Sequence, residues 1–180
     1  MQIFLPYDDF IKSAQAIDDR RLFTQITELA QIMSTVIWIQ DCDKAETLYS
    51  QELIYLPTHE NHPIVKWVCE DKKHVHFCIR YLYWLLWEYH MRFDVSHKVE
   101  RPIFNILLFH FRIIQEQLDY IALRVYEYAQ NFTTNHKHID EPFKAYRKEL
   151  NLKWNNDIMK GNYPKWTKRK EPEFFKKESV

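Results

Sequence analysis

The stretch LFTQITELAQIMSTV, residues 22–36, decides the fold of this 180-residue chain. Its apolar residues recur at steps of three and four, the spacing that gathers side chains on one face of an α-helix. A second set of residues recurs on another face, which is polar: Arg21, Gln25, Glu28 and Gln31. The stretch therefore predicts a long helix over about 8–38, with a break near Asp18, that buries one face and presents polar side chains on another.

Other periodic stretches predict further helices. They are expected over about 64–70, 72–93, 102–131 and 142–159, with a loop over 40–57. The single glycine, Gly161, agrees with this, because tight β-hairpins usually need glycine. We therefore expect an all-α fold: a compact single-domain bundle of about four to five helices over 1–180, in which 160–180 form an extended basic C-terminal tail packed on the body.

The net charge is zero but unevenly spread. Residues 142–180 carry 11 Lys and Arg against 5 Asp and Glu, and such a basic tail can bind phosphate or dock on the body itself. The most apolar run, 81–87, is much shorter than the about 20 residues of a membrane span, so we expect no membrane association. Three cysteines without metal-ligand spacing indicate reduced thiols in a cytoplasmic protein.

Glu28 is the first candidate for chemistry. Arg21 and Gln25 precede it on the same helix face, so its carboxylate can be held ionised and oriented. A solvated surface glutamate is the alternative interpretation.

A loop bounded by two prolines, PTHENHP at 57–63, is the second candidate. The imidazoles of His59 and His62 and the amide of Asn61 can grip a base edge or a phosphate, or transfer protons. Hydrogen bonding of these rings to the loop backbone is the structural alternative. Metal binding is weakly supported, because the two histidines lack a helical i, i+4 spacing. We expect no cofactor.

The third candidate is KWTKR at 165–169. Cations interleaved with an aromatic ring suit a phosphate backbone with a stacked base. The alternative is a tail anchored by its aromatic rings, with solvated lysines. The aromatic content of 16% has the same two interpretations, a bulky helical core or rings that stack on bases. Lesser candidates for the same pocket are His97, Lys98, Tyr146 and Arg147.

In order and spacing, several stretches resemble the pyrimidine-dimer DNA glycosylases related to phage endonuclease V. These are Leu5-Pro6-Tyr7, Asp18–Leu22, Glu28 with Ala30 and Gln31, Ser34-Thr35, Pro57–Pro63 with Trp67, Ala145-Tyr146-Arg147, and Lys165–Phe174. The resemblance spans nearly the whole chain. It implies a mostly helical single domain that binds damaged DNA.

The resemblance also implies a mechanism. The better-known members attack the glycosyl bond with the N-terminal α-amine, which forms a Schiff base with the sugar, and a helix glutamate assists. Glu28 falls at the position of that glutamate, and Met1 would carry the amine because the bulky Gln2 disfavours its removal. The residues expected to bind DNA or a nucleotide are Arg20, Arg21, Gln25, Gln31, Thr58, His59, Asn61, His62, Trp67, His97, Tyr146, Arg147, Lys165, Trp166, Lys168 and Arg169.

The chain departs from the family pattern around these positions. Gln2 and Ile3 stand where a small and a basic residue are usual, and Thr24 and Thr27 replace cations before the glutamate. One interpretation is a DNA N-glycosylase/AP lyase acting on pyrimidine dimers or modified bases. The other is a non-catalytic relative, such as a phage anti-defence protein, that sequesters a nucleotide or modified base in the same pocket. A helical interaction protein whose tail docks on a partner is a third interpretation.

Overall fold

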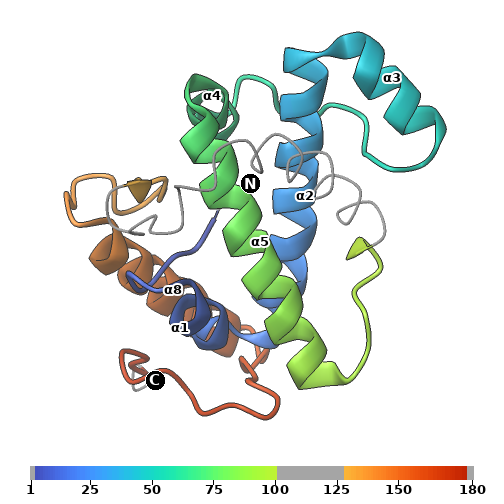
Figure 1. The fold of residues 1–180 in the computed structure, drawn as a ribbon. Coiled ribbons are helices and arrows are strands. Elements are labelled where there is room, and N and C mark those ends of the chain that lie inside the picture. Colours follow the sequence, from blue (N-terminus) through green and yellow to red (C-terminus); the bar gives the residue numbers. More distant parts are fainter. Residues whose placement is uncertain (1–2, 101–127, 178–180) are drawn as a thin grey trace.

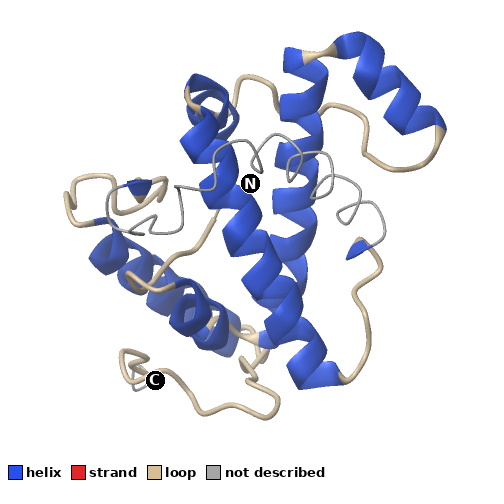
Figure 2. Cartoon of the chain, in the orientation of Figure 1, coloured by secondary structure: helices blue, strands red, loops and turns tan. Residues whose placement is uncertain are grey.

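The computed structural model describes residues 3–100 and 128–177, and within these ranges it contains helices and no strand (Figures 1 and 2). The predicted all-α class is confirmed. The helices are α1 (Phe10–Ala16), α2 (Asp19–Gln40), α3 (Cys42–Ser50), α4 (Pro63–Glu70), α5 (Lys72–Phe93) and α8 (Pro142–Met159). The helix predicted over 102–131 falls almost entirely outside the described residues.

Most of the predicted boundaries agree with the structure. The break near Asp18 is confirmed, since α1 ends at Ala16 and α2 begins at Asp19. The loop predicted over 40–57 is wrong, because α3 occupies its first half. The Asp41 side chain caps α3 by accepting a hydrogen bond from the Lys44 backbone N at 3.0 Å. Only two of its side chains are buried, so its apolar period is too sparse to see in the sequence.

The core lies between α2 and α5, which run side by side through the middle of the protein (Figure 1). Ile26, Leu29 and Met33 of α2 and Leu82 and Leu85 of α5 are fully buried. Helices α1 and α4 pack against α5, and α3 packs against α2. The apolar face read from residues 22–36 is therefore the centre of the fold.

Among the described residues, α2 is the one helix whose length and composition would allow it to cross a membrane. Within its most apolar 18-residue window, 61% of the helix is buried inside the protein. A core helix passes the same test of length and composition, and the packing of α2 against α3, α4 and α5 agrees with that role.

Arg92, near the end of α5, is a buried charge with every donor satisfied. Its side chain is 0% exposed, and its Nε donates to Glu88 at 2.6 Å. Its two terminal nitrogens donate, at 2.8 to 3.3 Å, to the Asp19 carboxylate and to three backbone carbonyls at the end of α1, those of Ala14, Gln15 and Ile17. A guanidinium has five N–H groups, and here all five have acceptors. Arg92 therefore joins α5, α1 and the start of α2.

The segment 165–169 crosses this junction as a strap. Trp166 is buried and donates from Nε1 to the Ala16 carbonyl at 2.8 Å. Arg169 makes a two-point contact with Glu88, with both distances at 2.9 Å. Thr167 donates to Asp19 at 2.7 Å, and Lys168 contacts Asp94 at the end of α5. The C-terminal part of the chain thus covers the Arg92 cluster.

Replacing Arg92 with methionine should strongly destabilise the protein. The variant leaves three backbone carbonyls without their donor and Glu88 with Arg169 alone, and breaking a buried pair in this way typically costs about 3–5 kcal/mol. Urea denaturation measures the loss. Arg20→Met is the matched control, because the Arg20 side chain is 72% exposed. We expect that control to cost less than about 1 kcal/mol, and equal losses in the two variants would contradict a structural role specific to Arg92.

Candidate functional site

Helix α2 carries a row of polar side chains made of Arg21, Gln25, Glu28 and Thr35, which we call the polar row. The steps of four, three and seven residues keep these positions on one side of the helix. At the start of the row Arg21 donates to Asp157 of α8 at 2.7 Å and to Asp18 at 3.1 Å. The first member of the row therefore fixes α8 against α2.

The second member, Gln25, holds the N-terminal segment Ile3–Pro6. It is 2% exposed, and its side-chain amide faces the backbone of Phe4. The Phe4 N–H donates to Gln25 Oε1 at 2.9 Å, and Gln25 Nε2 donates to the Phe4 carbonyl at 3.2 Å. The Tyr81 hydroxyl also donates to that carbonyl, at 2.5 Å. The amide thus pairs with an extended backbone as a neighbouring β-strand would.

Two further contacts fix the same segment. Ile3, Phe4 and Leu5 are all buried, and Arg147 of α8 donates from Nη1 to the Pro6 carbonyl at 3.1 Å. In Figure 1 the segment runs from the middle of the molecule, beside α2 and α5, down to α1. The start of the described chain therefore lies inside the fold, against the polar row.

The last member of the row, Thr35, holds the proline-bounded loop. Its hydroxyl accepts a hydrogen bond from the Thr58 backbone N at 3.0 Å and lies 3.1 Å from the Thr58 carbonyl oxygen. Within the loop, the Thr58 hydroxyl lies 2.6 Å from His59 Nδ1. His62 Nδ1 accepts from the Ile64 N–H at 3.2 Å and caps α4. Thr35 and this cap fix the two ends of the loop.

The middle of the loop projects from the fold. His59 and Asn61 are exposed, and His59 adopts a left-handed backbone with φ +55°, which is uncommon outside glycine. A polar side chain presented on a loop with fixed ends is a common arrangement at binding sites.

Glu28 lies on α2 between these two anchored segments. It is half-buried, one turn after Gln25 and two turns before Thr35. A helical turn rises about 5.4 Å, so Glu28 is within two turns of both the N-terminal segment and the loop. Gln31, also half-buried, follows one turn later. The polar row thus brings a carboxylate, a buried N-terminal segment and an imidazole-bearing loop to one side of α2.

The family model of the pyrimidine dimer DNA glycosylases matches residues 1–101, more than half of the chain. The chain belongs to this family. No curated protein and no solved structure matches it. The matched part contains the N-terminal segment, the polar row and the loop, whereas α8 and the strap follow it. The pyrimidine dimer DNA glycosylases act on DNA, which makes DNA the partner of the family.

Four aromatic residues that the sequence analysis named as candidate binding residues lie in the interior. Trp67 is 7% exposed, and its ring stacks on His74 with 4.2 Å between centroids. Tyr146 is buried and donates to the Gln130 carbonyl at 2.6 Å. Trp166 belongs to the strap, and His97 is also buried. Their placement favours packing over contact with a base, the alternative that the sequence left open.

The cations of the third candidate, 165–169, are engaged in a similar way. Lys168 and Arg169 pair with Asp94 and Glu88, while the Lys165 side chain is exposed and its carbonyl accepts from the Asp19 N–H at 2.8 Å. These contacts favour the anchored tail over a phosphate-binding arm for this segment.

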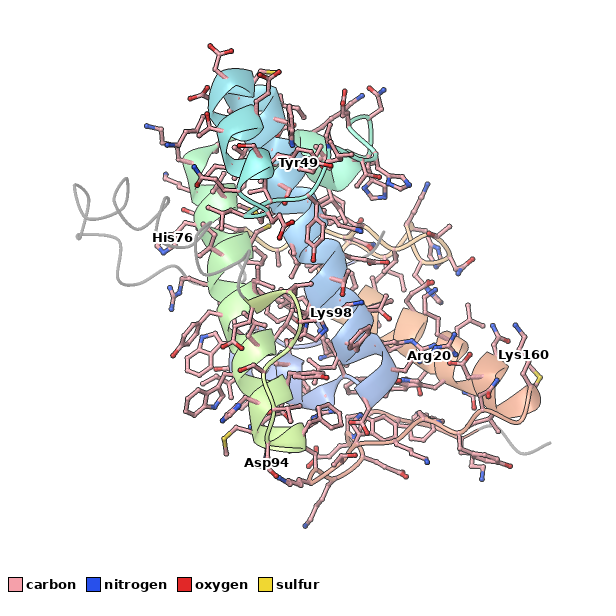
Figure 3. All side chains as sticks on the ribbon, turned by 90° about the vertical axis from the view of Figure 1, so that its right-hand side faces the viewer. Arg20, Tyr49, His76, Asp94, Lys98 and Lys160 are labelled. Atoms are coloured by element: carbon pink, nitrogen blue, oxygen red, sulfur yellow. The ribbon has the colours of Figure 1, made fainter. Side chains whose placement is uncertain are left out.

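The described cations at the start of α2 are engaged by carboxylates. Arg21 is committed to two carboxylates, and Arg20, exposed on the side of α2 that faces α8 (Figure 3), lies 3.7 Å from Asp157. The hydroxyls of Thr24 and Thr27 donate to backbone carbonyls of their own helix, at 3.0 and 3.3 Å. The threonine hydroxyls are therefore hydrogen-bonded to the backbone of α2 itself.

Within residues 3–100 and 128–177, no group of three or more His, Cys, Asp or Glu side chains could hold a metal ion. Two histidines outside the proline-bounded loop have other partners: His74 Nδ1 lies 2.6 Å from the Trp67 carbonyl, and His136 Nδ1 lies 3.0 Å from Glu149. Burial alone would raise the pKa of Glu149. Hydrogen bonds from His136 and Asn135 and the nearby Lys153 charge outweigh burial and lower that pKa.

His97 is packed between Phe23 and Tyr89, with centroid distances of 4.5 and 4.8 Å. It is 3% exposed, and its Nδ1 accepts from the Val99 N–H at 3.3 Å. Burial, aided by the Lys98 charge, lowers the pKa of His97 to about 4. The ring is therefore neutral in the folded protein near pH 7.

Sequence reasoning missed two residues that build the site. Thr35 holds the loop, and its position seven residues after Glu28 continues the period of the polar row, a signal that was present in the sequence. Tyr81 fixes Phe4, but it stands in a helix that is apolar nearly all round. Nothing in the sequence distinguishes its hydroxyl from those of the other tyrosines.

Gln25→Leu should release the N-terminal segment. The change keeps the volume of the side chain but removes both of its hydrogen bonds to Phe4. The Phe4 carbonyl keeps Tyr81 as a donor, but the buried Phe4 N–H is left unpaired, which costs about 1–3 kcal/mol of unfolding free energy. Hydrogen exchange should then be faster in a peptide covering Ile3–Pro6. Thr24→Val, at an exposed neighbouring position, should leave that exchange rate unchanged. Unaltered exchange in the Gln25 variant would contradict the anchoring role.

The unfolding free energy should carry a pH dependence from His97. Between pH 6.5 and 4 the unfolded chain binds a proton at this ring and the folded protein does not, so stability falls as the pH falls, by at most about 1.4 kcal/mol per pH unit. His97→Gln should remove this component. Urea denaturation of both proteins from pH 4.5 to 7 measures their unfolding free energies. Subtracting one from the other at each pH cancels the contribution of the other titrating groups. Parallel stability curves would contradict the buried neutral ring.

Proposed function

We propose that the chain is a DNA N-glycosylase/AP lyase of this family, acting in the cytoplasm on pyrimidine dimers or modified bases, with the α-amine of Met1 as nucleophile and Glu28 as the assisting carboxylate. The observation that carries the proposal is the pairing of Phe4 with Gln25, one turn from Glu28. Met1 lies outside the described residues. The backbone from Phe4 back to Met1 spans at most about 10 Å, a length comparable with two helical turns, which is compatible with an amine beside Glu28.

In the proposed reaction the amine attacks C1′ of the damaged nucleotide. The C1′–N glycosyl bond breaks and the base leaves with the bonding electrons. As the sugar ring opens, the Glu28 carboxylate relays a proton from the amine nitrogen to the ring oxygen, and the amine nitrogen and C1′ become a protonated imine. Removal of a C2′ proton by the Glu28 carboxylate expels the 3′-phosphate by β-elimination. One side chain thus serves two proton transfers.

The loop provides the binding part of the proposal. A base inside a duplex has to leave the stack before an amine can reach C1′. The exposed His59 and Asn61 present an imidazole and an amide that can hydrogen-bond a displaced nucleotide or its phosphate. Thr35 and the His62 cap hold the loop that carries them, so little ordering is needed on binding.

The engagement of the described cations at the start of α2 by carboxylates favours a second candidate function. A relative without chemistry could use the same pocket to sequester a nucleotide or modified base, and such a ligand needs fewer phosphate contacts than a duplex. Two observations support this alternative. Arg21 is paired with Asp18 and Asp157. The hydroxyls of Thr24 and Thr27 are hydrogen-bonded to the backbone of their own helix.

Borohydride trapping on DNA with a cyclobutane pyrimidine dimer or an abasic site tests the enzyme. Borohydride reduces an imine to a stable amine, so we expect a covalent protein–DNA adduct. Glu28→Gln should lower strand cleavage about 10²-fold or more, the scale of a general acid–base contribution. Glu46→Gln, at an exposed position on α3, is the matched control and should cleave like the unmodified protein.

Extending the chain by three residues ahead of Met1 completes the test, because it displaces the amine without changing a side chain. The extended protein should give no adduct, whereas an undiminished adduct would assign the nucleophile to a lysine. Absence of any adduct with the folded protein would contradict the enzyme. A melting temperature raised by one member of a nucleotide panel would then favour the sequestering relative, since a ligand at a hundredfold excess over its Kd stabilises by about 3 kcal/mol.

A further inference from the structure

Helix α8 and the C-terminal segment 174–176 enclose an open cleft of about 450 Å³ that neither the family match nor the polar row explains. Its floor is one face of α8, where the lining residues follow steps of three and four: Lys144, Arg147, Lys148, Asn151, Leu152 and Asn155. Phe174 and Lys176 form the other side, and His136 lies at one end. Figure 1 shows α8 at the edge of the fold, away from α3 and α4.

The wall of the cleft is held in place by two amide side chains of α8. Asn151 Nδ2 donates to the Phe174 carbonyl at 3.0 Å, and Asn151 Oδ1 accepts from the Lys176 N–H at 2.8 Å. Asn155 Nδ2 donates to the Lys176 carbonyl at 3.0 Å. The Phe174 ring packs on Trp154 beneath it with 5.7 Å between centroids. The cleft is therefore a fixed feature of the fold.

The lining contains three lysines, one arginine, one histidine and no carboxylate. Lys144, Lys148 and Lys176 are exposed and make no ion pair with any residue that the structure describes. Two neighbouring carboxylates are occupied, and a third, Glu173, is exposed beside Phe174. Glu149 is buried under His136, and Glu141 accepts hydrogen bonds from the first backbone N–H groups of α8 and lies 3.5 Å from Arg147. The charge of the cleft is therefore directed at a ligand rather than at the protein itself.

Two observations define the ligand. On α8, Lys144 and Lys148 lie one turn and about 6 Å apart, a spacing comparable with that of neighbouring phosphates of a nucleic-acid strand, and Lys176 faces them from the other side of the cleft. In addition, Arg147 bridges the cleft to the N-terminal segment through the Pro6 carbonyl, two residues from the Phe4 contact beside Glu28. A strand lying in the cleft would thus lead toward the candidate site.

We propose that this cleft binds the phosphate backbone of duplex DNA outside the lesion, through Lys144, Lys148 and Lys176. The proposal rests on the proposed function in one respect only, the identification of the phosphate-containing ligand as DNA. It assigns the excess positive charge of residues 142–180 to α8 and residue 176, and not to the strap, whose cations are paired within the protein.

The test is the affinity for an undamaged 20-base-pair duplex, followed by fluorescence anisotropy from 50 to 200 mM salt. The triple variant Lys144→Gln, Lys148→Gln, Lys176→Gln should bind about tenfold or more weakly in 0.1 M salt. Its slope of log K against log salt should be shallower by about 2–3, since each phosphate contact contributes about 0.9. The exposed positions suggest an unchanged melting temperature, which excludes unfolding as the cause.

A matched control separates the cleft from net charge. Lys12→Gln, Lys72→Gln, Lys170→Gln removes the same number of exposed charges elsewhere, and it should keep the affinity and the slope of the unmodified protein. Equal losses in both triple variants, or none in the cleft variant, would overturn the proposal. So would competition by inorganic phosphate or a mononucleotide at micromolar concentration, which would make the cleft a small-anion pocket, and so would a preference for single-stranded RNA.

The duplex-binding test and the borohydride test can fail separately. Binding of undamaged duplex that depends on the cleft lysines, together with no borohydride adduct on damaged DNA, would support the cleft and overturn the enzyme. An adduct on damaged DNA, with no effect of the three lysines on duplex affinity, would do the reverse.

Discussion

The buried guanidinium of Arg92 is the constraint on which the arrangement of the helices depends. A guanidinium buried away from solvent needs an acceptor for each of its donors, and the observed arrangement of α1, α2 and α5 offers five at once. Three of the acceptors are carbonyls at the end of α1, groups that a short helix leaves unpaired. Because Glu88 and Asp19 are shared with the strap, the same charge also fixes the C-terminal part of the chain.

A second principle recurs in the way that extended segments are held. The described residues contain no strand, so the backbone of an extended segment has no neighbouring strand to pair with. Side chains of the helices take that place: Gln25 pairs with Phe4, Thr35 with Thr58, and Asn151 with Phe174 and Lys176. Both the candidate site beside Glu28 and the cleft on α8 are built where a helix face holds a segment in this way. Both proposed binding surfaces thus lie where helix side chains satisfy the hydrogen-bonding groups of an extended backbone.

The sequence predicted the parts of the fold that have a strong period. The apolar seam from Leu22 to Val36 and the bounds of the central helix followed from spacing alone, and the family was visible in ordered short motifs. The ion pairs were not visible, because Arg169 and Glu88 are 81 positions apart and a cation in a basic tail looks the same whether it faces solvent or a buried carboxylate. For the same reason Trp166 read equally well as a stacking ring and as an anchor. At Gln25 the polar period was correct, but the sequence could not show that its partner is a backbone.

The burial of Ile3–Pro6 also sets an order of events during synthesis. These residues leave the ribosome shortly before Gln25, but two other groups that hold them, Tyr81 and Arg147, are made much later. The N-terminal segment therefore waits, with its apolar side chains unsheltered, until most of the chain has emerged. The segment therefore reaches its final place only after α8, which carries Arg147, has also emerged.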